Sequence, residues 1–285
     1  MWSAAPMVQD RGVMFLHDHR STDWALAYVL IAALVAILWF VVRALARRRV
    51  HWAEAVYLRS DPYVQASGLW FRSAPATFVY MAIWLSTTIL VQGSSKRLVD
   101  ALTEMDSSNI TEVMRAPARA ILVSGLLVAD RGAGLLAYVV VFVLIVARLE
   151  QRLGTPRTLI VWLCSHVFAT LLVLATEERL IAASVLRSTL ENTLDVGVSY
   201  VMVGSMGAYM LFVSRRWRWW YYALLALGIV GPVVLDREIW DLGHLLATLI
   251  GLASGVILTR WGVRPRLLWR PMCDRPPRPL ANPFA

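Results

Sequence analysis

Two side chains in the C-terminal half of the chain have the types that an acyl-transfer reaction needs. Ser199 lies within the stretch DVGVSYVMVGSMGA, and His244 lies within the stretch DLGHLLATLIGLASG. A histidine beside a serine can accept the hydroxyl proton as the oxygen attacks a carbonyl, and can return that proton to the leaving group. The residue types therefore indicate a nucleophile and its general base.

The two residues occupy matching places in their apolar stretches. Ser199 is four residues past Asp195, and His244 is three residues past Asp241. Each therefore lies roughly 5 to 6 Å along its helix from the start. If the two helices pack side by side, the imidazole can reach the hydroxyl. Asp195 and Asp241 are expected to cap the helix starts, where the dipole favours negative charge, and Asp241 could also orient the imidazole.

Both stretches carry small residues at helical spacing, which lets membrane helices approach closely. In the first stretch these are Gly197, Gly204, Gly207 and Ala208, and in the second Ala247, Gly251 and Gly255. A packed pair of helices is therefore predicted. In contrast, His166 lies halfway along another apolar run, which predicts a structural histidine that is too deep to share a site with Ser199.

The composition predicts a membrane protein. Of the 285 residues, 58% are hydrophobic and 16% are charged, whereas a soluble domain has about 25% charged residues. The net charge of +9 does not indicate nucleic-acid binding, because the arginines fall at the ends of apolar runs. The two cysteines form no disulfide framework or zinc spacing. We expect no metal, no cofactor and no nucleic-acid partner.

Seven apolar runs are long enough to cross most of a roughly 30 Å hydrocarbon layer. They cover residues 24–42, 74–92, 132–147, 157–176, 196–214, 219–235 and 242–259. The sequence therefore predicts an all-α polytopic membrane protein. The basic connections place the N-terminus outside and the C-terminus in the cytoplasm. A short helix from Pro117 to Val128 is expected in the outer interface, and the charged residues 177–179 are expected to be solvated.

Three stretches resemble signatures of the rhomboid intramembrane serine proteases. DVGVSYVMVGSMGA resembles the family's Gly-x-Ser-Gly…Gly-x-x-Gly-Ala pattern, with Ser199 at the nucleophile position. GHLLATLIG is similar to the family's Ala-His-x-x-Gly-x-x-x-Gly helix, with His244 at the base position. RLEQRLGTPR resembles the Glu-x-x-x-Gly turn between the second and third core spans, at Glu150 and Gly154.

The resemblance implies a six-helix rhomboid-like core at residues 74–260. Residues 1–73 would then be a leader, an extra N-terminal transmembrane helix and a cytoplasmic connection, and residues 261–285 a basic, proline-rich cytoplasmic tail. It also implies that substrates enter laterally from the bilayer and are cleaved near its outer face. The abundance of arginine, with Lys96 the only lysine, is typical of a bacterial genome, so a multi-pass protein of the plasma membrane is expected. The residues expected to pack this core or to support the oxyanion are Gly197, Tyr138, Gly204, Gly207 and Gly251.

The chain departs from the family pattern at the oxyanion site. Active rhomboids carry a His-x-x-x-Asn pair on the second core span, and counting back from Glu150 puts Gly134 and Tyr138 at those places. Tyr200 and Ala247 also replace glycines. Losing one oxyanion donor costs roughly a hundred- to a thousandfold in rate. Two alternatives therefore stay open: a serine protease acting on transmembrane segments, or a rhomboid fold that binds transmembrane clients without cleaving them. A transporter is disfavoured, because the charged residues lie between the runs and not within them.

Overall fold

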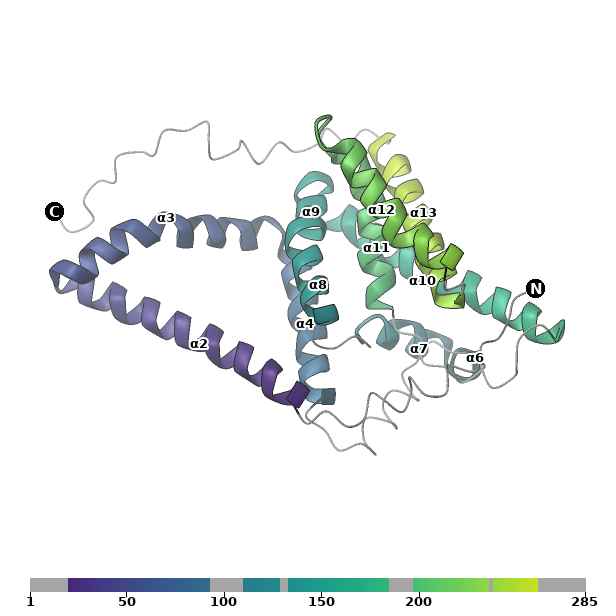
Figure 1. Ribbon diagram of the computed structural model, residues 1–285, viewed down its shortest axis with the longest axis horizontal. Helices are drawn as coiled ribbons and strands as arrows, with labels where there is room; N and C mark the ends of the chain where they lie inside the picture. The colour runs from purple at the N-terminus through teal and green to yellow at the C-terminus, as the bar shows by residue number, and fades with distance from the viewer. Residues whose placement is uncertain (1–19, 93–109, 129–132, 185–196, 236–237, 261–285) are drawn as a thin grey trace.

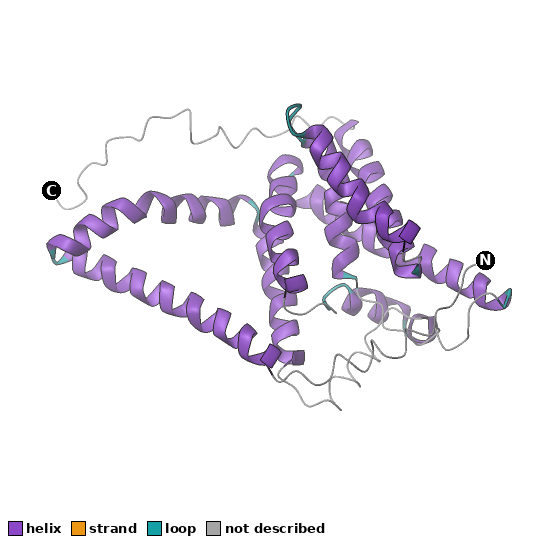
Figure 2. Ribbon diagram, viewed as in Figure 1, coloured by secondary structure: helices purple, strands orange, loops and turns teal. Residues whose placement is uncertain are grey.

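The described part of the chain is almost entirely helical (Figures 1 and 2). The computed structural model describes residues 20–92, 110–128, 133–184, 197–235 and 238–260, and this part of the chain contains no strand. The helices are α2 (Arg20–Arg47), α3 (His51–Ser73), α4 (Pro75–Gln92), α6 (Ile110–Arg115), α7 (Pro117–Ser124), α8 (Ala133–Val141), the π-helical η1 (Phe142–Val146), α9 (Ala147–Leu153), α10 (Thr155–Ala182), α11 (Val198–Tyr209), the short η3 (Met210–Phe212), α12 (Arg218–Leu235) and α13 (Ile239–Arg260).

Five helical segments in the described residues are long and apolar enough to cross a membrane. They are Leu30–Arg47, Gly134–Leu153, Thr155–Ala182, Arg218–Leu235 and Ile239–Arg260. Two shorter apolar helices cover Pro75–Ile89 and Val198–Phe212. Each of the seven predicted runs corresponds to one of these segments, which confirms the prediction of an all-α multi-pass membrane protein.

Helices α2 and α3 form a hairpin that projects from the rest of the described protein (Figure 1). Trp39 of α2 stacks on Tyr57 of α3, with ring centroids 5.4 Å apart and planes inclined by 19°. Most described side chains of α2 are exposed, including Val35 at 61% and Phe40 at 63%. Because large apolar side chains exposed in this way need an apolar solvent, α2 is surrounded mainly by lipid.

The tightest packing lies between α11 and α13. A Cβ added to Gly251 would lie 2.0 Å from the carbonyl oxygen of Gly204, and one added to Gly255 would lie 3.3 Å from the Cα of Ala208. The contacts advance along both helices in the same direction, so α11 and α13 run parallel. The missing side chains allow the two backbones to touch, as small residues do in membrane bundles.

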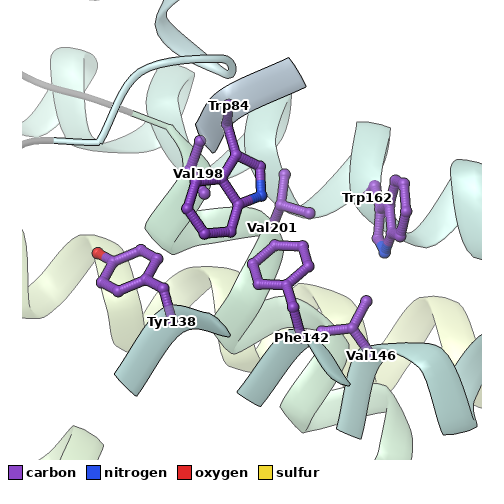
Figure 3. Packing of buried hydrophobic residues seen from close by; sticks show 7 residues of the cluster. All are labelled: Trp84, Tyr138, Phe142, Val146, Trp162, Val198 and Val201. Carbon is purple, nitrogen blue, oxygen red and sulfur yellow. The ribbon is translucent and has the colours of Figure 1, made fainter. Parts of the chain in front are cut away.

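A buried aromatic cluster joins four helical segments on the other side of α11. Figure 3 shows its members, which come from α4, α8 with η1, α10 and α11: Trp84, Tyr138, Phe142, Val146, Trp162, Val198 and Val201. The rings of Trp84 and Phe142 lie 5.4 Å apart. The π-helical turn η1 supplies Phe142 and Val146, both fully buried. The segment immediately before Ser199 is thereby packed against the second apolar span.

The Glu150 carboxylate joins the starts of two spans to α9. Its oxygens accept hydrogen bonds from the backbone N–H groups of Ala76 at 3.1 Å and Thr77 at 2.8 Å, and from the hydroxyls of Thr77 at 2.7 Å and Thr155 at 2.6 Å. The amides belong to the first turn of α4, where N–H groups lack helical acceptors and the dipole favours an anion. Gly154, with φ of 82°, ends α9 in a conformation that favours glycine.

Two charged residues lie deeper in the helices than the sequence predicts. Glu150 falls inside the apolar segment Gly134–Leu153 and is 1% exposed. Glu177 is 2% exposed, so its predicted solvation is wrong, whereas Glu178 and Arg179 are exposed as predicted. The reason is that α10 continues to Ala182, which keeps Glu177 on the same face as the buried Val173.

Candidate active site

Ser199 lies in the first turn of α11 and is 7% exposed. The N–H of Val201 donates to the carbonyl of Gly197 at 3.2 Å, so regular helical bonding starts there. The N–H groups of the preceding turn point out of the helix end. Asp195, which was expected to cap this helix, lies outside the described residues.

The packing of α11 on α13 brings Ser199 and His244 to one level. Gly204 lies between Ala247 and Gly251, because a Cβ on Gly204 would be 3.2 Å from the Ala247 carbonyl oxygen and one on Gly251 would be 2.0 Å from that of Gly204. The midpoint of those two α13 positions is five residues past His244, and Gly204 is five residues past Ser199. Both residues therefore lie about 7.5 Å from this contact, toward the N-terminal ends of α11 and α13.

Tyr200 fills the space between the two helices at the same level. Its ring meets the imidazole of His244 edge-on, with centroids 5.6 Å apart and an interplanar angle of 72°. The side chain is 1% exposed, and a Cβ added to Gly243 would lie 2.4 Å from its hydroxyl oxygen. The tyrosine that replaces a family glycine thus packs directly against the predicted base.

Ser199 does not point along the glycine face of α11. Ser199 and Gly204 are five residues apart, so their side chains leave the helix in directions that differ by about 140°. Ser199 and Met206 are seven residues apart, so their directions differ by only about 20°. The carbonyl of Met206 accepts the hydroxyl of Tyr221 on α12 at 2.8 Å. Ser199 therefore lies on the side of α11 that faces α12, with α13 beside it.

His166 lies next to the start of α11, and its predicted position, too deep for this site, is wrong. The side chain is 6% exposed, and a Cβ added to Gly197 would lie 1.9 Å from its Cε1. Its ring centroid is 6.3 Å from that of Tyr200. The physical reason is that α10 is 28 residues long whereas α11 starts only at Val198, so the middle of α10 is level with a recessed helix start.

The family of the chain follows from a comparison over most of its length. The model of the family described as "Rhomboid-like protein" matches residues 69–262, from the last turn of α3 to just beyond α13. The chain belongs to the rhomboid-like protein family. No curated protein and no solved structure matches it.

In this rhomboid-like protein, His166 ties α10 to α7, the short helix between α4 and α8. Its Nε2 lies 2.6 Å from the carbonyl oxygen of Ile121 in α7. Since a carbonyl only accepts, Nε2 carries a hydrogen and donates it to Ile121. Nδ1 is buried and has no hydrogen-bond partner among the described residues. This histidine is a buried connection that the sequence did not predict at the site.

The C-terminal end of α7 is held by donors from three spans. Besides the histidine of α10, the N–H of Gly197 donates to the carbonyl of Ser124 at 2.8 Å. From α4, the hydroxyl of Tyr80 donates to the Gly125 carbonyl and that of Thr87 to the Leu126 carbonyl, the latter at 2.8 Å. Such partners satisfy the last carbonyls of a helix. The amide of Gly197 is therefore engaged in packing and is not directed at Ser199.

The two positions that the sequence resemblance assigns to the oxyanion pair, Gly134 and Tyr138, both lie in α8. Gly134 is the second residue of the helix, and Tyr138 is 9% exposed within the aromatic cluster. The Tyr138 hydroxyl points away from Trp84 and Phe142 (Figure 3). Of the two side chains, only the tyrosine can donate a hydrogen bond.

Asp241 caps α13. Its carboxylate accepts the N–H of Glu238 at 3.2 Å, which is the reach from the third helical residue back to the residue before the helix. This agrees with the interpretation of Asp241 as a capping residue. No group of three or more His, Cys, Asp or Glu side chains in the described ranges is arranged to hold a metal ion.

Proposed function

We propose that this rhomboid-like protein is an intramembrane serine protease in which Ser199 is the nucleophile and His244 the general base. The observation that supports the proposal is the packing register of α11 on α13. From this register we infer that Ser199 and His244 lie at the same height along the two helices. Tyr200 supports the imidazole from the side, with ring centroids 5.6 Å apart. The substrates would be transmembrane or juxtamembrane segments of other membrane proteins.

The reaction follows from these two groups. The Ser199 oxygen attacks the peptide carbonyl carbon and its proton passes to His244. The C–N bond of the tetrahedral intermediate then breaks, and His244 gives the proton to the leaving amine. A water molecule attacks the acyl-enzyme, with His244 accepting its proton and returning it to the serine oxygen. The products are an amine and a carboxylic acid.

The oxyanion would be stabilised by fewer donors than in active rhomboids. The backbone N–H of Ser199 belongs to the first turn of α11, whose amides point out of the helix and favour negative charge. Tyr138 is the one candidate side-chain donor of α8. Because the N–H of Gly197 already donates to Ser124 at 2.8 Å, we assign it no role in catalysis.

The orientation and boundaries belong to the same proposal. Residues 74–260 would form the catalytic core, with residues 1–73 and 261–285 as additions at either end. The basic connections support an external N-terminus and a cytoplasmic C-terminus in a bacterial plasma membrane. Ser199 and His244 would then act in the outer half of the bilayer.

A second function is favoured by one specific observation. Gly134 and Tyr138 replace the His-x-x-x-Asn pair, which removes two donors at the place where charge develops. A chain that keeps the helical core without these donors could bind transmembrane clients in the same place without cleaving them.

A fluorophosphonate probe on the purified, folded protein separates the two functions. The protease predicts covalent labelling that is lost in Ser199→Ala and reduced at least a hundredfold in His244→Ala, because an unassisted hydroxyl is a weak nucleophile. Ser205→Ala is the matched control: Ser205 lies in the same helix, is fully buried and donates to the Val201 carbonyl at 2.7 Å, so its loss should leave labelling intact. Absence of labelling in folded wild-type protein would favour client binding.

A further inference from the structure

The turn between α2 and α3 gathers positive charge at one end of an apolar span. The seven residues 43–49 contain four arginines and no acidic residue. All four, Arg43, Arg47, Arg48 and Arg49, are exposed. Arg49 has a φ of 60°, a left-handed conformation uncommon outside glycine, so the chain turns sharply at the centre of this group. The cluster is therefore compact as well as charged.

Contacts between α2 and α3 hold this turn together. The ring of Tyr57 stacks on Trp39 of α2. Burial and a hydrogen bond to Asp61 raise the pKa of Tyr57, while the nearby guanidinium groups of Arg43 and Arg47 act in the opposite direction. Both arginines of α2 therefore lie close to the first turns of α3.

The charged turn lies where hydrocarbon gives way to water. The preceding side chains of α2 are apolar and exposed, among them Leu34 at 55%, Ile37 at 59% and Phe40 at 63%. Trp52, at the start of α3, is 58% exposed, and tryptophan favours the interfacial region of a bilayer. Guanidinium groups that directly follow such a segment are at the depth of the lipid headgroups.

The far end of α3 returns to the same boundary. There the guanidinium of Arg148 lies over the ring of Trp70, 5.6 Å from its centroid, and the apolar helix α4 begins at Pro75. Figure 1 shows α3 running across the direction of α4. Large exposed side chains follow its length, with Tyr63 at 74% and Phe71 at 53%. Both ends of α3 thus meet one membrane surface, as in a helix that lies in the interface.

We propose that the α2–α3 turn is a binding site for anionic phospholipid headgroups, in which Arg43, Arg47, Arg48 and Arg49 contact the lipid phosphates and α3 lies in the same leaflet. A guanidinium matches the geometry of a phosphate with two parallel hydrogen bonds. A lipid of net negative charge is favoured over a zwitterionic one, because the choline group of the latter offsets its phosphate. Each arginine near an anionic surface contributes about a fivefold preference.

The test uses the full chain in nanodiscs of phosphatidylglycerol and phosphatidylcholine, with a diazirine-bearing analogue of one lipid or the other. Cross-links from the phosphatidylglycerol analogue should map to the first half of α3 and exceed those from the phosphatidylcholine analogue at least tenfold. The triple variant Arg47→Gln, Arg48→Gln, Arg49→Gln should abolish that preference. If it does not fold, Arg48→Gln and Arg49→Gln alone should each reduce the preference about fivefold.

The matched control removes the same charge from another exposed turn, by Arg215→Gln, Arg216→Gln and Arg218→Gln. It should leave the cross-links on α3 unchanged. An equal loss in this control would show that only total charge matters, and equal cross-linking by both lipid analogues would show no headgroup preference. Competition by inorganic phosphate would assign the arginines to the free ion. Each of these three results overturns the proposal, and none depends on whether Ser199 reacts with a fluorophosphonate.

Discussion

The membrane segments of α2 and α10 are equally apolar, yet one is exposed and the other is half buried within the protein. By mean hydropathy their membrane segments cannot be distinguished, but 50% of the α10 segment is buried within the protein and only 6% of the α2 segment. In lipid, an apolar side chain has no preference for the protein interior, because hydrocarbon tails are as apolar as leucine. Hydropathy therefore shows which segments enter the membrane and not which of them pack together.

The difference lies in the small and polar residues. On α10 the buried face carries Thr158, Ser165, His166, Thr170 and Glu177. Opposite it, Gly197 and Gly204 of α11 leave room for His166 and Ser165, because a Cβ on Gly204 would lie 2.2 Å from the Ser165 Oγ. The described part of the α2 span, before Arg43, contains only apolar residues. The core of this protein is therefore defined by close backbone contact and buried polar groups, and not by hydropathy.

The largest effect is expected where two backbones touch. Gly251→Ala would place a methyl group 2.0 Å from the Gly204 carbonyl oxygen, and a backbone cannot move aside as a side chain can. We expect a loss of about 3 kcal/mol in the free energy of unfolding, the upper part of the usual range for overpacking. Thermal unfolding in detergent would measure it. Gly207→Ala, whose Cβ would meet the Thr248 carbonyl oxygen at 2.1 Å, should behave alike.

The control for this change is another helical glycine. A Cβ added to Gly228 of α12 would meet nothing within 4 Å. Gly228→Ala should therefore cost nothing and should stabilise the protein by up to about 1 kcal/mol, because alanine favours the helix over glycine. If both alanine variants were equally stable, close approach of α11 and α13 would not be what distinguishes the core from the α2–α3 hairpin.

The sequence predicts the seven apolar helices well, because each is an apolar run bounded by charges. It does not predict α3, because His51–Ser73 lies within the charged stretch 43–73, which is expected only to be a connection. The packing of α11 on α13 also follows, since glycines at helical spacing mark both. What it does not predict is how far each helix extends relative to its neighbour. The proximity of His166 to Gly197 depends on α11 starting level with the middle of α10, and that offset is a property of the whole bundle. One signal was available: His166 lies four residues from both Trp162 and Thr170, on one face of the helix.

A smaller effect is expected from removing the His166 donor. His166→Leu leaves the Ile121 carbonyl without its partner and should cost about 2 kcal/mol, whereas His166→Gln keeps an N–H and should cost less. Since His166 packs on Gly197, hydrogen exchange of the Gly197 amide should rise about tenfold or more in the leucine variant. Unchanged exchange there, with α13 amides exchanging faster, would mean that His166 supports the bundle in general and not the start of α11.

The smallest effects compare one substitution in the two regions. Val146 of η1 is fully buried beside Trp84 and Phe142, and Val35 of α2 is 61% exposed. Val146→Ala removes two methyl groups from a packed cluster and should cost about 1 to 2 kcal/mol through lost contacts. Val35→Ala exchanges lipid contacts for lipid contacts and should change stability by less than about 0.5 kcal/mol. An equal loss of stability in Val35→Ala would mean that α2 is covered by protein and not by lipid. If the stability of that variant also depended on protein concentration, the covering protein would be a second copy of the chain.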